Sequence, residues 1–234
     1  AFKDYDLILT NPPFGTKKGG ERPTRDDLTF PSSNKQLNFL QVIYRSLRPN
    51  GKSRAAVVLP DNVLFQEGDG QKVRVDLMNK CNLHTILRLP TGIFYAQGVK
   101  ANVLFFDRKP ASEAPWTKTL WIYDLRTNKN FTLKTNQLTR QDLDEFVACY
   151  HPENRYDRRP TWSENHPDGR WRAFTYDELM ARDKVNLDIF WLRDETLEDS
   201  ANLPDPDVLA GEIVEELGAA LEQFASIYEE LGEE

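Results

Sequence analysis

Runs of apolar residues alternate along the chain with apolar residues at helical spacing, and this alternation predicts an α/β fold. Four runs are typical of buried strands, at residues 5–10, 54–60, 83–89 and 102–106. A candidate cap at Asn34 precedes one helical pattern, and residues 71–80 form another with Val73 and Leu77 inward. The first pattern places its apolar residues on one face: Leu37, Leu40, Ile43, Tyr44 and Leu47. Repeated strand–helix–strand connections predict an open sheet of parallel strands, such as 54–60, with right-handed crossovers.

Further helices are predicted near the C-terminus. Thr175 and Glu178 have the spacing of a capping box, so a helix should begin near residue 176. After Pro204 and Pro206, apolar residues recur at intervals of three and four, at Ile213, Leu217, Ala220, Leu221, Phe224, Ile227 and Leu231. That spacing is typical of a coiled-coil seam, so we expect this tail to dock on a partner. A helix packed on its own domain is the alternative.

The net charge of −7 hides an uneven distribution of charge along the chain. Residues 195–234 hold thirteen of the 37 acidic residues and none of the 30 Lys and Arg, so the other 194 residues carry a balance of +6. A mildly basic body can approach the phosphates of a nucleic acid, whereas DNA would repel the acidic tail. We therefore expect the tail to face protein or solvent.

The composition is ordinary for a soluble protein and argues against several other classes. With 39% apolar and 29% charged residues, the chain can bury one sizeable core with an appendage. No apolar run reaches the ~18 residues of a membrane span and no signal peptide is visible, so we expect a cytoplasmic protein without membrane contact. Cys81, Cys149 and the three histidines lack disulfide or metal-ligand spacing. We interpret His84 and His151 as structural or surface residues.

The sequence Asn11-Pro12-Pro13-Phe14 directly follows the first predicted strand and is the leading candidate for chemistry. Open α/β sheets bind ligands at the carboxyl ends of their strands. The Asn11 carboxamide offers an acceptor, and the prolines fix the backbone so that the Pro12 carbonyl is free to accept a second bond. With the ring of Phe14 beside them, these acceptors suit the exocyclic amine of a flat heterocycle. A tight turn without function is the alternative.

This tetrapeptide resembles the catalytic Asn-Pro-Pro-aromatic motif of the adenine-N6 DNA methyltransferases. The resemblance implies that the Asn11 side chain and the Pro12 carbonyl accept hydrogen bonds from the target amino group, while Phe14 stacks on the flipped adenine. It also implies direct in-line transfer of a methyl group from S-adenosylmethionine, so that positioning carries most of the catalysis. In agreement, no nucleophilic Cys or His stands near the motif.

Two further segments are candidates for substrate contacts. The loop of residues 90–99 resembles the target-base motif of the same family, in which an aromatic residue at the position of Phe94 packs on the other face of the flipped base. Phe94 could instead be a core aromatic beneath the loop. Residues 15–33 are polar and include Lys17 and Lys18, which we expect in a flap that touches the DNA backbone. A solvated surface loop is the alternative there.

A cofactor loop is missing from the predicted elements. Methyltransferases of this class are expected to bind S-adenosylmethionine through a Gly-rich loop after their first strand, upstream of the catalytic motif. Only ten residues precede Asn11, and the glycines within 19–20 and 68–70 are predicted to lie in ordinary loops. We therefore expect this chain to be a fragment of a longer protein, without measurable cofactor binding or activity when isolated.

Residues 171–191 look like the C-terminal part of the methylation subunits of type I restriction-modification systems, and the resemblance spans essentially the whole chain. It implies double-stranded DNA as the substrate, with a specificity subunit, a restriction subunit and a second copy of the methylation subunit as partners. The expected fold is α/β, a partial doubly wound methyltransferase-type (Rossmann-like) sheet with a C-terminal helical extension. Its regions would be the C-terminal half of the catalytic domain (1–130), a mixed helical and loop extension (131–200) and the acidic tail for subunit docking (201–234).

Two other functions stay open. A protein-glutamine methyltransferase could grip a side-chain amide with the same motif, although such proteins are expected to carry Tyr in place of Phe14 and to lack the acidic tail. A truncated subunit could instead serve as a non-catalytic assembly module, docking on the specificity subunit without methylating DNA.

Overall fold

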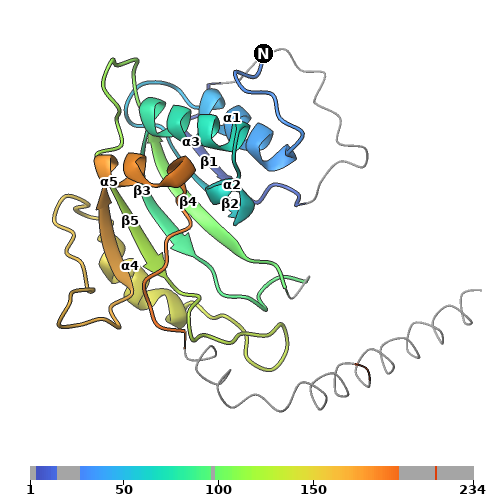
Figure 1. The fold of residues 1–234 in the computed structure, drawn as a ribbon, viewed down its shortest axis with the longest axis vertical. Helices are drawn as coiled ribbons and strands as arrows, with labels where there is room; N and C mark the ends of the chain where they lie inside the picture. The colour runs from blue at the N-terminus through green and yellow to red at the C-terminus, as the bar shows by residue number, and fades with distance from the viewer. Residues whose placement is uncertain (1–3, 15–26, 96–97, 195–213, 215–234) are drawn as a thin grey trace, which may run out of the picture. The chain divides into compact units, whose positions relative to one another are not determined.

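The computed structural model describes residues 4–14, 27–95, 98–194 and Val214 of the 234-residue chain. Its described part contains a six-stranded sheet in the order β1-β2-β4-β3-β5-β6 (Figure 1). The strands are β1 (Leu7–Thr10), β2 (Arg54–Pro60), β3 (Cys81–Arg88), β4 (Ala101–Arg108), β5 (Thr119–Asp124) and β6 (Trp171–Thr175). β1 is parallel to β2 and β3 is parallel to β5, whereas β4 is antiparallel to β2 and β3, and β6 is antiparallel to β5.

The parallel pair of β1 and β2, joined through α1, confirms one predicted crossover, whereas the mixed sheet corrects the prediction for the strands that follow. β2 is parallel to β1 only, and β3 returns directly into the antiparallel β4 through the loop of residues 89–100. A parallel return needs a crossover element, usually a helix, and the described part of this loop contains none. The sequence analysis also missed β5 and β6, although residues 120–123 are apolar on both faces of the sheet.

Polar side chains set the beginnings of two helices, as predicted. α1 (Lys35–Ser46) begins after Asn34, whose side chain accepts hydrogen bonds from the backbone N–H groups of Gln36 and Leu37. α5 (Tyr176–Ala181) begins with the capping box formed by Thr175 and Glu178. The other helices described are α2 (Asn62–Phe65), α3 (Asp69–Lys80) and α4 (Asp144–Tyr150), with 3₁₀ turns at Gln141–Leu143 and Asp183–Val185.

Helix α3 begins two residues earlier than predicted, which corrects the assignment of residues 68–70 to a loop. Gly68 is the N-cap with a φ of +61°, a conformation that glycine adopts readily. Asp69 and Gly70 lie in the first turn of α3, where the Asp69 carboxylate faces the positive end of the helix dipole.

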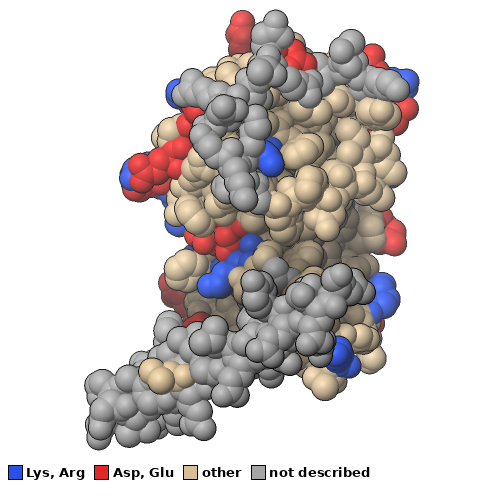
Figure 2. Space-filling model, turned by 90° about the vertical axis from the view of Figure 1, so that its right-hand side faces the viewer, with Lys and Arg blue, Asp and Glu red and all other residues tan. Residues whose placement is uncertain are grey.

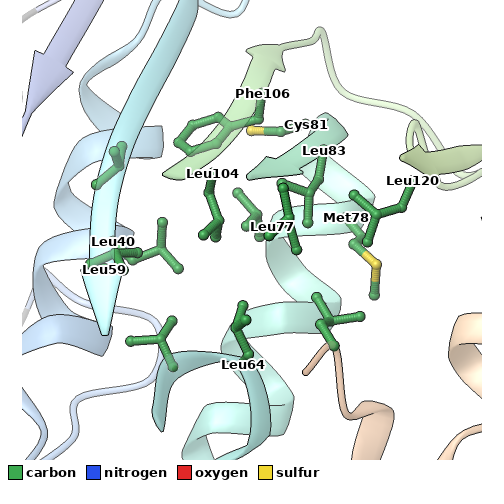
Figure 3. Close-up of a cluster of buried hydrophobic side chains, with 14 of the residues drawn as sticks. Leu40, Leu59, Leu64, Leu77, Met78, Cys81, Leu83, Leu104, Phe106 and Leu120 are labelled. Atoms are coloured by element: carbon green, nitrogen blue, oxygen red, sulfur yellow. The ribbon is translucent and has the colours of Figure 1, made fainter. Parts of the chain in front are cut away.

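Helices α1, α2, α3 and α5 cover one face of the sheet and enclose the larger core (Figures 1 and 3). Figure 3 shows Leu59 of β2, Leu104 of β4 and Leu77 of α3 among the side chains of this core. All three side chains are buried, and each stabilises the fold by roughly 1.5–3 kcal/mol relative to an exposed position. The residues predicted to face inward from α1 and α3 are all buried, which confirms both helical patterns.

The opposite face of the sheet carries α4 and a second, aromatic core. Phe146 of α4 makes edge contacts with Tyr123 and Trp171, at ring-centroid distances of 5.5 and 6.4 Å. Trp171 also stacks on Trp121 at 5.2 Å, which fixes β6 beside β5. The face that carries this second core is also the one on which Phe14 and Phe94 pack.

β1 is an edge strand with two exposed leucines. Leu7 and Leu9 point to the same face of the sheet and expose 52% and 69% of their surfaces. Figure 2 looks at the side of the molecule toward which this edge lies, and it shows a broad area of uncharged residues among the described ones. Apolar side chains at an unpaired edge are typical of a surface that another protein element covers.

The chain divides into two compact units, residues 1–193 and 194–234. In the second unit the structure describes Asp194 and Val214, and Val214 is helical with 69% of its surface exposed. The seam predicted from Ile213 to Leu231 falls outside the described residues and stays a prediction. The predicted boundary between the catalytic domain and the extension, at residue 130, is also untested and stays a prediction. None of the helices described is long and apolar enough to cross a membrane.

Candidate active site at the carboxyl edge of the sheet

The predicted site residues follow strands that end at one edge of the sheet, which we call the carboxyl edge. β1, β2, β3 and β5 end here, while β4 and β6 begin here. The register aligns these ends, because Pro60 pairs with Ala101, and Arg88 pairs with both Asn102 and Asp124. The turn of residues 11–14 and the loop of residues 89–100 therefore leave the sheet at the same edge, where α/β folds place their chemistry.

The Asn11–Phe14 turn presents polar and aromatic groups outward on a buried support. Pro12 is buried, Phe14 is half-buried, and Asn11 and Pro13 are exposed. The Asn11 carboxamide has no hydrogen-bond partner among the described residues, so its oxygen is available to accept a bond from a ligand. A buried proline beneath it holds the backbone of the turn in place.

Phe14 and Phe94 come from separate segments and lie in contact. Their ring centroids are 5.8 Å apart and their planes make an angle of 66°, an edge-to-face arrangement. The structure thus brings together the two aromatic residues that the sequence analysis assigned to opposite faces of one base. Both also pack on the second core, so Phe94 partly fits the alternative of a core aromatic beneath its loop.

The two rings as they stand leave no room for a base between their faces. Stacking a planar base on two rings requires a face-to-face separation of ~7 Å, twice the ~3.5 Å contact distance between carbon atoms. The observed edge-to-face contact at 5.8 Å closes that space. Binding of a base between their faces would have to turn or separate the two rings.

Arg126 ties both ends of that loop to the neighbouring strands. Its guanidinium donates two hydrogen bonds to the Asp61 carboxylate, at 2.7 and 2.8 Å, from the turn after β2. It also donates to the backbone carbonyls of Leu89 and Ala101, each at 2.8 Å, which flank the loop. Asn102 donates a further bond of 2.8 Å to Asp61. We call the pair of Arg126 and Asp61 the loop clamp.

The loop clamp is mostly withdrawn from solvent, with side-chain exposures of 10% for Arg126 and 14% for Asp61. Burial alone would raise the pKa of Asp61, but the hydrogen bonds and charge of Arg126 outweigh it and hold that pKa below its ordinary value. Asp61 is therefore ionised at neutral pH. The paired charges are satisfied only together, because each would be left buried without the other.

A second buried ion pair supports the ends of β3 and β5. Arg88 donates a hydrogen bond of 2.6 Å to Asp124, which is fully buried. Asp124 also accepts bonds from the backbone N–H groups of Arg126 and Thr127, so it shapes the turn that leads into the loop clamp. The sequence analysis singled out none of these charged residues, although Asp61, Arg88 and Asp124 each lie at or near the end of an apolar run.

Gly92 makes the sharp turn in the loop of Phe94, and we predict that Gly92→Ala destabilises it. Its φ is +80°, and a Cβ there would lie 1.8 Å from the carbonyl oxygen of Phe131. Gly51 has the same φ but open space around it, so Gly51→Ala is the matched control for backbone strain alone. Thermal melts should show a larger fall in Tm for Gly92→Ala, since ~1–3 kcal/mol of strain is common to both variants and the clash is not. An equal fall in Tm for the two variants would mean that the residues around Phe131 shift to make room for the new Cβ at little cost.

Other predicted residues fall elsewhere. Lys17 and Lys18 lie outside the described residues, so their proximity to the site stays a prediction. His84 is buried at the other end of β3 and His151 is a half-buried helix C-cap, which agrees with structural roles. Cys81 is buried and Cys149 half-buried, and both are free thiols. In the part of the chain that the structure describes, no cluster of His, Cys, Asp and Glu could hold a metal ion.

The family model for N-6 DNA methylases matches residues 1–188. The chain belongs to this family. It is 43% identical to the EcoKI methylase subunit of Escherichia coli (strain K12) and 43% identical to the StySJI methylase subunit of Salmonella typhimurium, both type I restriction enzymes. Each match covers 97% of this chain and 47% of the relative. This N-6 DNA methylase chain therefore spans about half the length of the curated relatives it matches.

Solved structures of N-6 DNA methylases show the same fold. The crystal structure of the EcoKI M protein matches 99% of this chain and 51% of that protein, with a TM-score of 0.72 and 39% identity. A modification subunit of a putative type I restriction enzyme from Vibrio vulnificus YJ016 matches 84% of this chain and 40% of that protein, with a TM-score of 0.62 and 30% identity. The predicted family and the predicted α/β fold class are confirmed.

Proposed function

We propose that the complete protein methylates the exocyclic amine of adenine in double-stranded DNA, as the modification subunit of a type I restriction-modification system. The observation that carries this proposal is that Phe14 and Phe94 come together near Asn11, whose carboxamide has no hydrogen-bond partner among the described residues. An acceptor next to two aromatic rings suits an adenine turned out of the duplex. The identity to methylase subunits over nearly the whole chain supports it further.

In the proposed reaction this chain supplies the acceptor side. The Asn11 oxygen and the Pro12 carbonyl accept the two hydrogens of the target amine, so that its lone pair points away from the ring plane. Phe14 and Phe94 hold the base by stacking, worth ~1–3 kcal/mol per base. The cofactor, S-adenosylmethionine, supplies an electrophilic methyl group. The amine nitrogen would form the new bond to the methyl carbon as the bond from that carbon to the sulfonium sulfur breaks, with the thioether S-adenosylhomocysteine as leaving group, and the nitrogen would then lose a proton to solvent.

The described residues do not fit the main cofactor site. A Gly-rich cofactor loop joins a strand directly to a helix, and none of the described glycines, at 51, 68, 70, 92, 98 and 169, lies in such a connection. We propose that the cofactor loop belongs to the segment upstream of residue 1 in the complete protein. The open edge of β1, with the exposed Leu7 and Leu9, is where the rest of that sheet would continue.

The proposed partners follow from the same family. Double-stranded DNA would contact the carboxyl edge, with Lys17 and Lys18 near its backbone. A specificity subunit would choose the sequence, a second methylation subunit would complete the modification enzyme, and a restriction subunit would add cleavage. Such a complex would work in the cytoplasm.

The test is methyl transfer by the full-length protein mixed with its specificity subunit. With labelled S-adenosylmethionine and duplex DNA, we expect label in DNA and N6-methyladenine by mass spectrometry. The 234-residue chain alone should neither bind the cofactor by calorimetry nor transfer label. Label on a protein glutamine instead would favour the protein-glutamine methyltransferase. Assembly with the specificity subunit but no transfer by the full-length protein would favour the assembly module.

Deleting residues 207–234 should abolish docking of the specificity subunit and leave the α/β body folded. Residues 207–232 could span ~39 Å as a helix at 1.5 Å per residue, enough to lie along a partner. The measurement is a pull-down beside a thermal melt. A matched variant that replaces the acidic residues of 207–234 by Gln, with the apolar positions kept, should retain docking but slow its association. If the deletion lowers the melting temperature of the body, the helix belongs to the core and docking is not its role.

A further inference from the structure

A basic and aromatic cavity lies away from the carboxyl edge, on the sheet face that carries α4. It has a volume of about 380 Å³ and opens between the first residues of β3 and β5, the loop that follows β4, and residues 155–158. Its lining includes Lys109, Lys118, Arg155 and Arg158 as cations, and Trp116, Trp121 and Tyr156 as aromatic rings. None of these residues belongs to the site formed by Asn11, Phe14 and Phe94.

The cavity carries more positive charge than its own acid can balance. Asp107 is a carboxylate that contacts the lining residues His84 and Arg155, and Arg155 occupies it with a bond of 2.6 Å. Burial alone would raise the pKa of Asp107, but contacts with His84 and Arg155 hold that pKa at about 2. Burial lowers the pKa of His84 to about 4, so His84 is neutral at pH 7. Lys118 forms no ion pair with the described carboxylates.

Arg158 is the most telling group, because it is a buried cation without a carboxylate. Arg158 is 8% exposed, and it forms no ion pair with any of the described carboxylates. It donates to the carbonyl of Tyr150 and the hydroxyl of Thr85, yet its Nη2 has no hydrogen-bond partner. An uncompensated buried charge is strongly unfavourable, even with the ring of Tyr150 at 4.5 Å. An anion in the adjoining cavity would supply the missing charge.

Two of the three aromatic rings of the cavity, Trp116 and Trp121, are held in place by their own contacts. The Trp116 indole N–H donates to the carbonyl of Pro110 at 2.8 Å, and the ammonium of Lys109 lies 5.9 Å from its ring centroid. Trp121 stacks on Trp171 through one face. Tyr156 is fully exposed at the rim. Fixed flat rings beside cations are the arrangement that binds a planar base with an attached phosphate.

We propose that this cavity binds a free nucleotide, with the phosphate bound by Lys118 and attracted by the buried charge of Arg158, and with the base on the indole rings. Its size is at the lower end of the range for small-molecule sites, which suits a mononucleotide. The site is independent of methyl transfer, because it lies on residues that the proposed reaction does not use.

The test is calorimetry of the 234-residue chain with adenosine 5′-monophosphate, inorganic phosphate, adenosine and a 5′-phosphorylated single-stranded oligonucleotide. We expect the mononucleotide to bind at least tenfold more tightly than phosphate or adenosine. Lys118→Glu and Trp116→Ala should each weaken it about tenfold or more. The matched control Lys129→Glu reverses the charge of another exposed lysine and should change nothing.

Binding should also persist in Asn11→Ala, which separates this cavity from the proposed adenine site. The proposal is overturned if the mononucleotide does not bind at millimolar concentration, or if Lys118→Glu and Lys129→Glu behave alike. Adenosine binding as tightly as the mononucleotide would remove the phosphate from the site. An oligonucleotide that binds while the mononucleotide fails to compete would make this a nucleic-acid contact and overturn the proposal as well.

Discussion

Replacing Asn11 by Ala in the full-length protein is expected to lower the rate of DNA methylation by ~10²–10³, because it removes a positioned acceptor for the target amine. Asn11 is exposed and unpartnered among the described residues, so the same change should leave the melting temperature nearly unaltered. Single-turnover methyl transfer to duplex DNA measures the effect on the chemical step. Asn130→Ala, another exposed asparagine, is the matched control and should retain full activity.

The aromatic residues beside Asn11 are expected to act at a different step. Phe14→Ala and Phe94→Ala should weaken capture of the flipped base, which a fluorescent adenine analogue in the target position reports directly. Phe14→Tyr should be tolerated, since it keeps the ring. Asn11→Ala should leave the analogue's fluorescence change in place while transfer fails. If Asn11→Ala retained more than a tenth of the wild-type methylation rate, the turn would have a structural role only. The proposed hydrogen bond from the target amine to Asn11 would then be wrong.

Much of this site could be predicted from the sequence, because the site residues lie directly after predicted strands. Asn11 and Phe14 could be placed at a carboxyl end from the apolar run before them, and Phe94 from the loop between two such runs. What could not be foreseen is that β3 and β4 form an antiparallel pair. That pairing returns the chain at once beside β2, and it brings the loop of Phe94 to within 5.8 Å of Phe14 by ring centroids.

The charged layer beneath the site could not be predicted for a different physical reason. Arg126 and Asp61 are 65 residues apart, and each alone resembles a solvated residue at the end of a strand. Only the sheet order, which places β3 and β4 between β2 and β5, makes the two side chains meet across the loop ends. Local patterns report helix caps such as Thr175 with Glu178, but they carry no information on pairs formed by sheet topology.

Replacing Arg126 by Met is expected to lower the free energy of unfolding by roughly 3–5 kcal/mol, the usual effect of removing one partner of a buried ion pair. The variant leaves the Asp61 carboxylate buried beside Asn102 and removes the donor from the carbonyls of Leu89 and Ala101. For a chain of this size the melting temperature should fall by about 10 °C. Arg140→Met, which breaks the exposed pair of Arg140 with Asp144, is the matched control and should change stability by less than ~0.5 kcal/mol.

The pH dependence and a double variant test the same loop clamp. Folding lowers the pKa of Asp61 below its ordinary value of 3.8, so the clamp stabilises the fold above that pH. Its contribution is lost as the pH falls through the pKa of the folded state. The difference in the free energy of unfolding between wild type and Arg126→Met should therefore become smaller below pH 3.8. Adding Asp61→Asn to Arg126→Met should recover part of the loss at pH 7, because no buried charge remains unpaired. An Arg126→Met variant as stable as Arg140→Met would show that the loop of Phe94 is held by other contacts.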